Sequence, residues 1–136
     1  MRQASQKLGW RLLKIFSSLQ ANEFVQQYTK AIEEKKAMGH YGIAFGAIAH
    51  AMDIFKKDAL SGFFYNAAAG MVTNSVKLVP LGQQDGQAIL FSLQDLIEEL
   101  VMASIMPDRD NIGLCCTGFD VRCMQHEQLY SRLYMS

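Results

Sequence analysis

The spacing of apolar residues constrains this chain most strongly, because it repeats with the period of an α-helix in one segment after another. The clearest repeat lies between a glycine-containing turn and Pro107, where an apolar residue recurs every three or four positions. Its members are Ile89, Leu90, Leu93, Leu96, Ile97, Leu100, Val101 and Ile105. Only 2 Pro interrupt the 136 residues, of which 50% are hydrophobic. The pattern predicts an all-α fold, a compact bundle of about five to six helices with a flexible C-terminal tail.

Four earlier segments show the same period. We expect helices over residues 4–20, over 22–39 with Asn22 as its cap, over 41–55, and from Asp58 to Pro80. The apolar side of the first is Leu8, Leu12, Ile15, Phe16 and Leu19, and that of the third is Tyr41, Phe45, Ile48, Met52 and Phe55. Small residues beside the third stripe, Gly42, Gly46, Ala47 and Ala51, would let a neighbouring helix approach closely. A more polar helix is expected from Asp120 to Leu133, with fraying toward Ser136.

Length and charge limit the function classes. A chain of 136 residues suits one domain, residues 1–136. Thirteen Lys+Arg balance 13 Asp+Glu, so the formal net charge is zero, which removes the usual electrostatic case for a nucleic-acid binder. Weak self-repulsion favours association with other chains. The polar start opens no secretory signal, and 3 Cys, two of them adjacent, suit a reducing cytoplasm.

One uncharged stretch raises the alternative of a membrane-embedded helical protein. Ala59–Val76 carries no charge over 18 residues, which is the lower limit for a membrane span. It also contains Ser61, Asn66, Thr73, Asn74 and Ser75, and polar groups at this density are costly in hydrocarbon. We therefore favour a helix buried in protein, with no membrane partner.

Sequence motifs for catalysis are absent. The glycines around Gly82 and Gly86 match neither the phosphate-binding nor the dinucleotide-binding pattern, and no strand precedes them. No nucleophile elbow or paired-histidine zinc motif occurs. No set of residues supplies a nucleophile, a base and an oxyanion donor together, so we expect no enzyme and no cofactor.

A metal-binding protein is a further alternative. Cys115, Cys116, Cys123 and His126 carry thiol and imidazole ligands, and Cys123 and His126 share a helix face at i, i+3. No spacing typical of a zinc site completes the set, and free cysteines commonly act as small buried hydrophobes. The four residues are weak candidates for a metal site.

Two segments are unexplained by packing alone, Asn74–Gln87 and Met124–Ser136. Each mixes apolar and polar residues, and the second places Leu129, Tyr130, Leu133, Tyr134 and Met135 at a chain end. Such segments are typical of docking peptides that order on a partner. The turn Val76–Gln83 and the closing run from His126 to Ser136 resemble the two best-marked segments of the UreF family of urease accessory proteins. The resemblance extends in register from Ala4 to the last residue.

The resemblance implies a non-enzymatic, all-α homodimeric chaperone that binds UreD (UreH in some systems) and recruits the GTPase UreG for nickel insertion into apo-urease. It assigns partner binding to Lys77, Val79, Pro80, Gly82, Gln83, Tyr130, Arg132 and Leu133. Arg132 would brace the Lys77–Gly82 turn when UreD binds, since its planar fork suits free carbonyls. Tyr65 falls near the family's dimer contact, and Ser61 replaces an expected Arg there.

The family members are longer than this chain and carry an N-terminal helical region. The resemblance therefore implies an N-terminally truncated protein, the C-terminal portion of a UreF. A non-functional truncated fragment is accordingly a further alternative, and the apolar faces of the first and third helices would then seek a partner.

Overall fold

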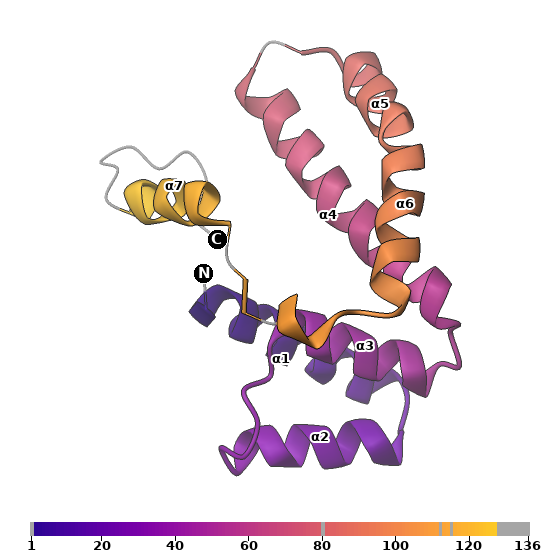
Figure 1. Ribbon diagram of the computed structural model, residues 1–136. Coiled ribbons are helices and arrows are strands. Elements are labelled where there is room, and N and C mark those ends of the chain that lie inside the picture. The colour runs from indigo at the N-terminus through magenta and orange to yellow at the C-terminus, as the bar shows by residue number, and fades with distance from the viewer. Residues whose placement is uncertain (1, 80, 112, 115, 128–136) are drawn as a thin grey trace. The chain divides into compact units, whose positions relative to one another are not determined.

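The computed structural model describes residues 2–79, 81–111, 113–114 and 116–127, and they form helices and connecting turns (Figure 1). The helices are α1 (Arg2–Leu19), α2 (Glu23–Glu33), α3 (Tyr41–Ala51), α4 (Lys56–Leu78), α5 (Gln83–Ser92), α6 (Gln94–Ile105), the 3-10 turn η1 (Arg109–Asn111) and α7 (Thr117–Glu127). The all-α prediction is confirmed. The last helix, expected from Asp120, already begins at Thr117 as α7, and the 3-10 turn η1 lies in the connection before it.

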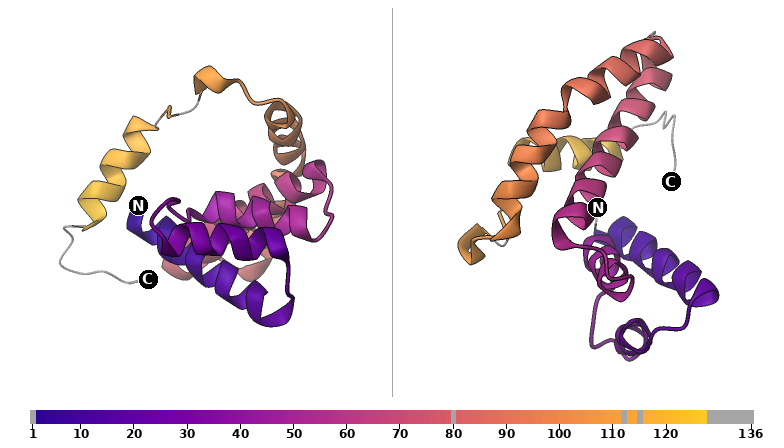
Figure 2. Two further views of the ribbon diagram at one scale, coloured as in Figure 1. Left: turned by 90° about the horizontal axis from the view of Figure 1, so that it is seen from below. Right: turned by 90° about the vertical axis from the view of Figure 1, so that its right-hand side faces the viewer.

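The chain divides into two compact units. The first, Arg2–Met106, holds α1–α6, and the part from Pro107 onward holds η1 and α7. In the first unit α1, α2 and α3 pack together, and α4 leads away from α3 beside α5 and α6 (Figures 1 and 2). The predicted flexible tail, residues 128–136, lies outside the described residues.

The core of the first unit is built where α1, α2 and α3 meet. Its buried side chains are Leu13, Phe16, Val25 and Ala44. The predicted apolar side of α1 is only partly right: Phe16 is buried, whereas Leu8, Ile15 and Leu19 are exposed. The reason is that α2 and α3 cover one side of α1, the side that carries Gly9, Leu13 and Phe16.

Helix α3 turns its small residues inward. Ala44, Ala47 and Ala49 are its buried residues, while Met52 and Phe55, predicted as core, are 53% and 79% exposed. Alanines permit a short distance between helix axes, and α3 packs most extensively on α1. Of the small residues predicted to allow a close approach, only Ala47 is buried, whereas Gly42 and Gly46 are exposed. Ala44 and Ala49 share the contact with Ala47, and the large stripe is not the main core face.

Two glycines make this approach possible. A Cβ on Gly9 of α1 would collide with the carbonyl oxygen of Gly39, in the link between α2 and α3. Gly39 itself has φ of 66°, a left-handed conformation that favours glycine. Asn22 caps α2 as predicted, its Oδ1 accepting from the Val25 N–H at 3.1 Å. The start of α2 is therefore as predicted, whereas α2 ends at Glu33, six residues before the predicted stop at Gly39.

Aromatic rings join α3 to α4. Tyr41 stacks on Phe63 with ring centroids 5.8 Å apart, and Phe45 meets Phe63 edge to face at 5.4 Å. Asn66 Nδ2 donates to the Tyr41 hydroxyl at 3.3 Å. Helix α4 begins at Lys56, two residues before the predicted cap Asp58. Asp58 therefore lies inside the helix, and the aromatic contact joins the second and third turns of α4 to α3.

The predicted fifth helix is two helices. It breaks at Leu93, between α5 and α6, and both segments pack along α4. Lys56 Nζ, at the start of α4, donates to the carbonyl oxygen of Ile105 at 2.6 Å, so α6 ends where α4 begins. The two helices α4 and α6 thus run antiparallel (Figure 1). Among the described residues no helix, α4 included, is long and apolar enough to cross a membrane.

Candidate partner-binding site

The turn between α4 and α5 holds most of the site residues predicted in the first unit. Helix α4 ends at Leu78, Val79 is extended with φ of −116° and ψ of 145°, and Gly82 precedes α5. The Gly82 N–H donates to Asp85 Oδ2 at 2.9 Å, which is half of a capping box. This bond fixes the chain entering α5. Pro80, the centre of the predicted turn, lies outside the described residues.

A close contact between α4 and α5 lies next to the turn. Gly86 is buried, and a Cβ built on it would stand 2.9 Å from Val76 Cγ2 and 3.4 Å from Val72 Cγ1. The absence of a side chain at Gly86 therefore lets α5 lie directly on α4. The position of the turn depends on this glycine as much as on the turn residues themselves.

A shallow hollow of about 410 Å³ opens between α4 and α5 next to the turn. Lys77 and Gln83, two of the predicted partner-binding residues, both line it. The other lining residues are Val72, Thr73, Val76, Gly86, Gln87 and Leu90. Lys77, Val79, Gly82 and Gln83 are all exposed, so the structure brings four predicted residues to one end of the α4–α5 pair.

The structure adds residues that were not among the predicted partner-binding residues. Val72, Val76 and Leu90 form the apolar floor of this hollow, and Gln87 lies at its edge. Their helical spacing suggested only core positions. Gly86 was expected in the turn before the fifth helix but lies inside α5, and it was the signal that could have indicated a close helix contact here.

Tyr65 lies near the middle of α4, away from the turn. Twelve residues separate it from Lys77, which corresponds to about 18 Å along a helix. Its side chain is 46% exposed and stands between two hollows of about 410 and 420 Å³, which also involve Gln94 at the start of α6. Ser61 lines one of these hollows, and its hydroxyl donates to the Lys57 carbonyl oxygen at 2.9 Å. The two residues associated with a dimer contact are thus neighbours, and both are accessible from one side of α4.

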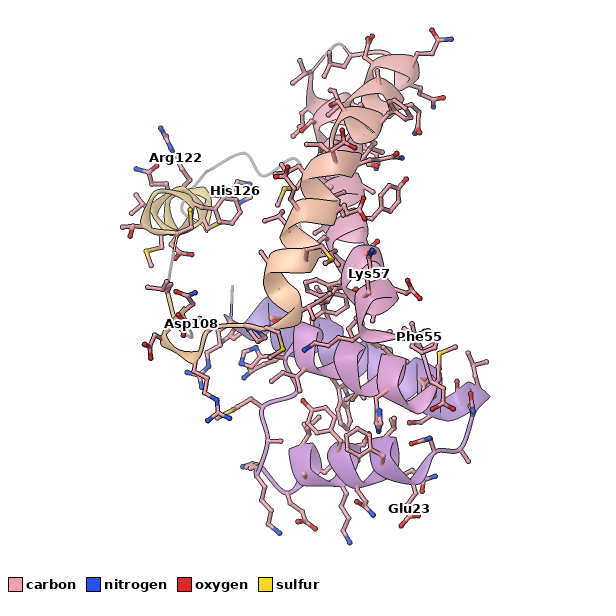
Figure 3. All side chains as sticks on the ribbon, turned by 45° about the vertical axis from the view of Figure 1, so that its right-hand side comes forward. Glu23, Phe55, Lys57, Asp108, Arg122 and His126 are labelled. Atoms are coloured by element: carbon pink, nitrogen blue, oxygen red, sulfur yellow. The ribbon has the colours of Figure 1, made fainter. Side chains whose placement is uncertain are left out.

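An ion pair borders the same surface. Lys57 Nζ, labelled in Figure 3, lies 3.3 Å from Glu98 Oε1 and joins α4 to α6. Both side chains are more than half exposed, so the pair contributes little free energy of folding. It lies between the two helices beside the Ser61 and Tyr65 surface.

A larger hollow, of about 620 Å³, lies between α3 and α4, away from the predicted residues. Phe45, Leu60 and Phe63 give it an apolar wall, and His50, Asp53 and Lys56 stand at its rim. His50 packs edge to face against Phe24 with centroids 5.4 Å apart. The hollow is an apolar surface depression with no nucleophile placed beside a base.

The second unit holds the weak metal candidates. Cys116 is exposed, Cys123 is half-buried, and His126 (Figure 3) is exposed near the end of α7. Cys123 and His126 share this helix as expected. Within the described ranges no group of three or more His, Cys, Asp or Glu side chains is placed to hold a metal ion. Cys115, Tyr130, Arg132 and Leu133 lie outside the described residues, so their predicted roles stay predictions.

A comparison with known protein families supports the resemblance that the turn residues indicated. Residues 1–94, which include α1–α5 and the whole α4–α5 turn, match the profile of the family described as UreF. The chain belongs to the UreF family. The match also contains Ser61 and Tyr65, so both predicted surfaces of α4 lie inside the region typical of a UreF.

Individual UreF relatives match nearly the whole chain. Urease accessory protein UreF of Actinobacillus pleuropneumoniae serotype 5b (strain L20) is 49% identical over 99% of this chain and 60% of its own length. UreF of Haemophilus influenzae (strain PittGG) is 48% identical over 99% of this chain and 57% of its own length, and UreF of Bacillus sp. (strain TB-90) is 34% identical over 99% and 60%. The chain thus spans about three fifths of the length of these UreF proteins.

Proposed function

We propose that this chain is a scaffold of urease maturation with no reaction of its own. In this role it binds UreD (UreH) and recruits the GTPase UreG, and the assembly inserts nickel into apo-urease in the cytoplasm. The observation that carries the proposal is the exposed end of the α4–α5 pair, where Lys77, Val79, Gly82 and Gln83 meet inside the UreF-matched region.

The chemistry of this end suits a protein partner. Leu78 and Val79 are 52% and 50% exposed, so apolar surface lies next to the Lys77 ammonium group and the polar edge of the hollow. Interfaces commonly combine an apolar centre with a polar rim. Gly86 and the Gly82–Asp85 bond hold the turn in place, which reduces the ordering cost of binding.

A pull-down with UreG in the presence of UreD tests the proposal. Lys77→Glu reverses a charge at the edge of the hollow, and we expect recruitment to fall about tenfold or more, as is typical of an interface anchor. Lys30→Glu, at an exposed position of α2, is the matched control and keeps full recruitment. Equal recruitment by both variants would show that the turn is not the GTPase-facing surface.

A second variant addresses the tail. Arg132→Ala is expected to leave the helical content unchanged by circular dichroism and to weaken UreG recruitment, because the planar Arg fork would no longer brace the turn. A pull-down in which this variant retains full recruitment would contradict that part of the proposal.

Homodimerisation through the α4 surface is a separate part of the proposal. Tyr65 is 46% exposed between two hollows, and aromatic residues are enriched in interfaces. Tyr65→Asp is expected to shift the sedimentation of the chain from dimer toward monomer. Met71→Asp, on the same helix and 61% exposed, is the control and leaves the dimer intact. A dimer that persists in Tyr65→Asp would exclude this contact.

A further inference from the structure

Helix α1 presents a second apolar side that the other described residues of the first unit do not cover. Leu8, Ile15 and Leu19 are 53%, 59% and 81% exposed, and half-buried Leu12 lies between them. The four residues recur at steps of four, three and four, which is the spacing of the seam in a coiled coil. Leu12 packs against the core cluster at the edge of this stripe, whereas the exposed Leu8, Ile15 and Leu19 lie outside that cluster. The free side of α1 is thus shaped to receive another helix.

A basic row borders the stripe. Lys7, Arg11 and Lys14 recur at steps of four and three, so they lie along one line of the helix next to Leu8 and Ile15. All three are exposed, and within the described residues none of them has an ion pair. Helix α1 contains no acidic residue. A helix seated on the apolar stripe would therefore gain from Asp or Glu on the flank that faces this row.

The length of the relatives indicates where such a helix comes from. The 135 residues that match the A. pleuropneumoniae UreF make up 60% of that protein, so its full length is about 225 residues and about 90 of them have no counterpart here. Ninety residues are enough for several helices of ordinary length. An apolar seam in a protein of family length is normally covered, because exposed apolar stripes favour aggregation.

We propose that the free side of α1 is the docking face for an acidic amphipathic helix, supplied by the part of a family-length UreF that this chain does not span. The helix would pack its apolar seam on Leu8, Ile15 and Leu19 and pair its carboxylates with Lys7, Arg11 and Lys14. The inference goes beyond the scaffold function and does not depend on UreG recruitment.

A membrane surface fits this face less well. The exposed stripe covers an arc of only about 40–60° around the helix, estimated at 100° per residue, and the adjoining side of α1 is already packed on α3. An interfacial helix needs a broad apolar face to lie in the headgroup region. A narrow seam with one charged flank is the pattern of a helix pair.

Co-purification tests the docking face. The 136-residue chain carrying a tag is produced together with the residues of A. pleuropneumoniae UreF that lie outside the matched region. We expect an equimolar complex, which Ile15→Asp abolishes and the double variant Lys7→Glu/Lys14→Glu weakens at least tenfold. The matched controls are Met71→Asp, whose side chain is exposed to a similar degree, and Lys30→Glu, and both keep the complex.

The variants are first compared alone, by circular dichroism and thermal unfolding, and unchanged curves show that Ile15→Asp acts on docking. The absence of a complex with wild type, or a complex that Ile15→Asp leaves intact, would overturn the proposal. A dimer of the chain alone that Ile15→Asp dissociates would instead assign the face to a second copy. Binding to phosphatidylglycerol-containing vesicles, lost in Ile15→Asp, without a complex would assign it to a lipid surface.

Discussion

The hydroxyl of Ser5, on α1, accepts a hydrogen bond from the backbone N–H of Tyr41 at 3.2 Å and thereby caps a helix 36 positions away in the sequence. Helix α3 has no side-chain cap of its own, since His40 occupies its N-cap position without such a bond. His40 Nδ1 also lies 3.3 Å from Ser5 Oγ. The start of α3 is therefore satisfied through tertiary structure and held against α1.

Replacement of this remote cap should weaken the α1–α3 contact. Ser5→Ala leaves the Tyr41 N–H without its partner, and we expect the free energy of unfolding to fall by about 1 kcal/mol. Urea denaturation followed by circular dichroism measures the change. Ser18→Ala is the control, because its hydroxyl bonds only to the nearby Ile15 carbonyl oxygen on an exposed turn. Equal stability of Ser5→Ala and wild type would exclude the capping role.

The close approach of Gly9 to the Gly39 carbonyl oxygen predicts that alanine substitutions at two glycines have opposite effects on stability. Gly9→Ala places a methyl group against backbone, and we expect a loss of about 3 kcal/mol or failure to fold, since neither backbone segment can shift cheaply. Gly46→Ala, on α3 with open space around its position, should gain about 0.5–1 kcal/mol from helix propensity. Thermal unfolding of both variants checks the contrast, and similar values for the two would contradict the packing.

Gly86 provides a related prediction for the α4–α5 pair. Gly86→Val would force α5 away from Val76 and should cost about 1–3 kcal/mol. Gly62→Ala, also on the α4 side of the pair but with no atom nearby, should be neutral or stabilising. Hydrogen exchange of the amides in α5 follows the effect locally. Unchanged protection in Gly86→Val would show that the close contact is not required.

The Tyr28 hydroxyl predicts a pH effect at the alkaline end. Its oxygen is buried without a hydrogen-bond partner of good geometry among the described residues. Burial raises the pKa of Tyr28, and the nearby Gly39 backbone partly opposes this increase. The folded state then holds the proton while the unfolded state loses it, so stability falls as the pH rises above about 10. Tyr28→Phe removes the titrating hydroxyl, which is buried without a satisfactory hydrogen bond. We expect equal or greater stability at pH 7 and a shallower decline at pH 10–11 in urea titrations, whereas a parallel decline in both proteins would contradict the assignment.

The ion pair between Lys57 and Glu98 should contribute little to the free energy of unfolding. Both side chains are exposed, and such pairs contribute about 0–1 kcal/mol. Glu98→Gln is therefore expected to shift the free energy of unfolding by less than about 0.5 kcal/mol, with the difference disappearing in 0.5–1 M salt. A larger loss in chemical denaturation would mean that the pair holds α6 in place.

The sequence alone determined the helical class, because a period of three to four residues persists from Leu8 to Ile105. It also determined the start of α2, since Asn22 caps through a local bond that needs no partner from elsewhere. The turn Val76–Gln83 could be located as a candidate site because the order of its residues is itself the signal.

Which side of each helix is buried was decided only by tertiary structure. Periodicity gives α1 a broad apolar side, but the positions of α2 and α3 bury Leu13 and leave Ile15 exposed. In α3 the alanines, rather than the stripe of large side chains, form the contact with α1. Short side chains permit a small distance between the axes of two crossing helices. The break at Leu93 and the hollow shared by Lys77 and Gln83 likewise depend on how α5 lies on α4. Local spacing specifies that a helix forms, whereas the neighbour that each face meets is set by contacts between residues far apart in the chain.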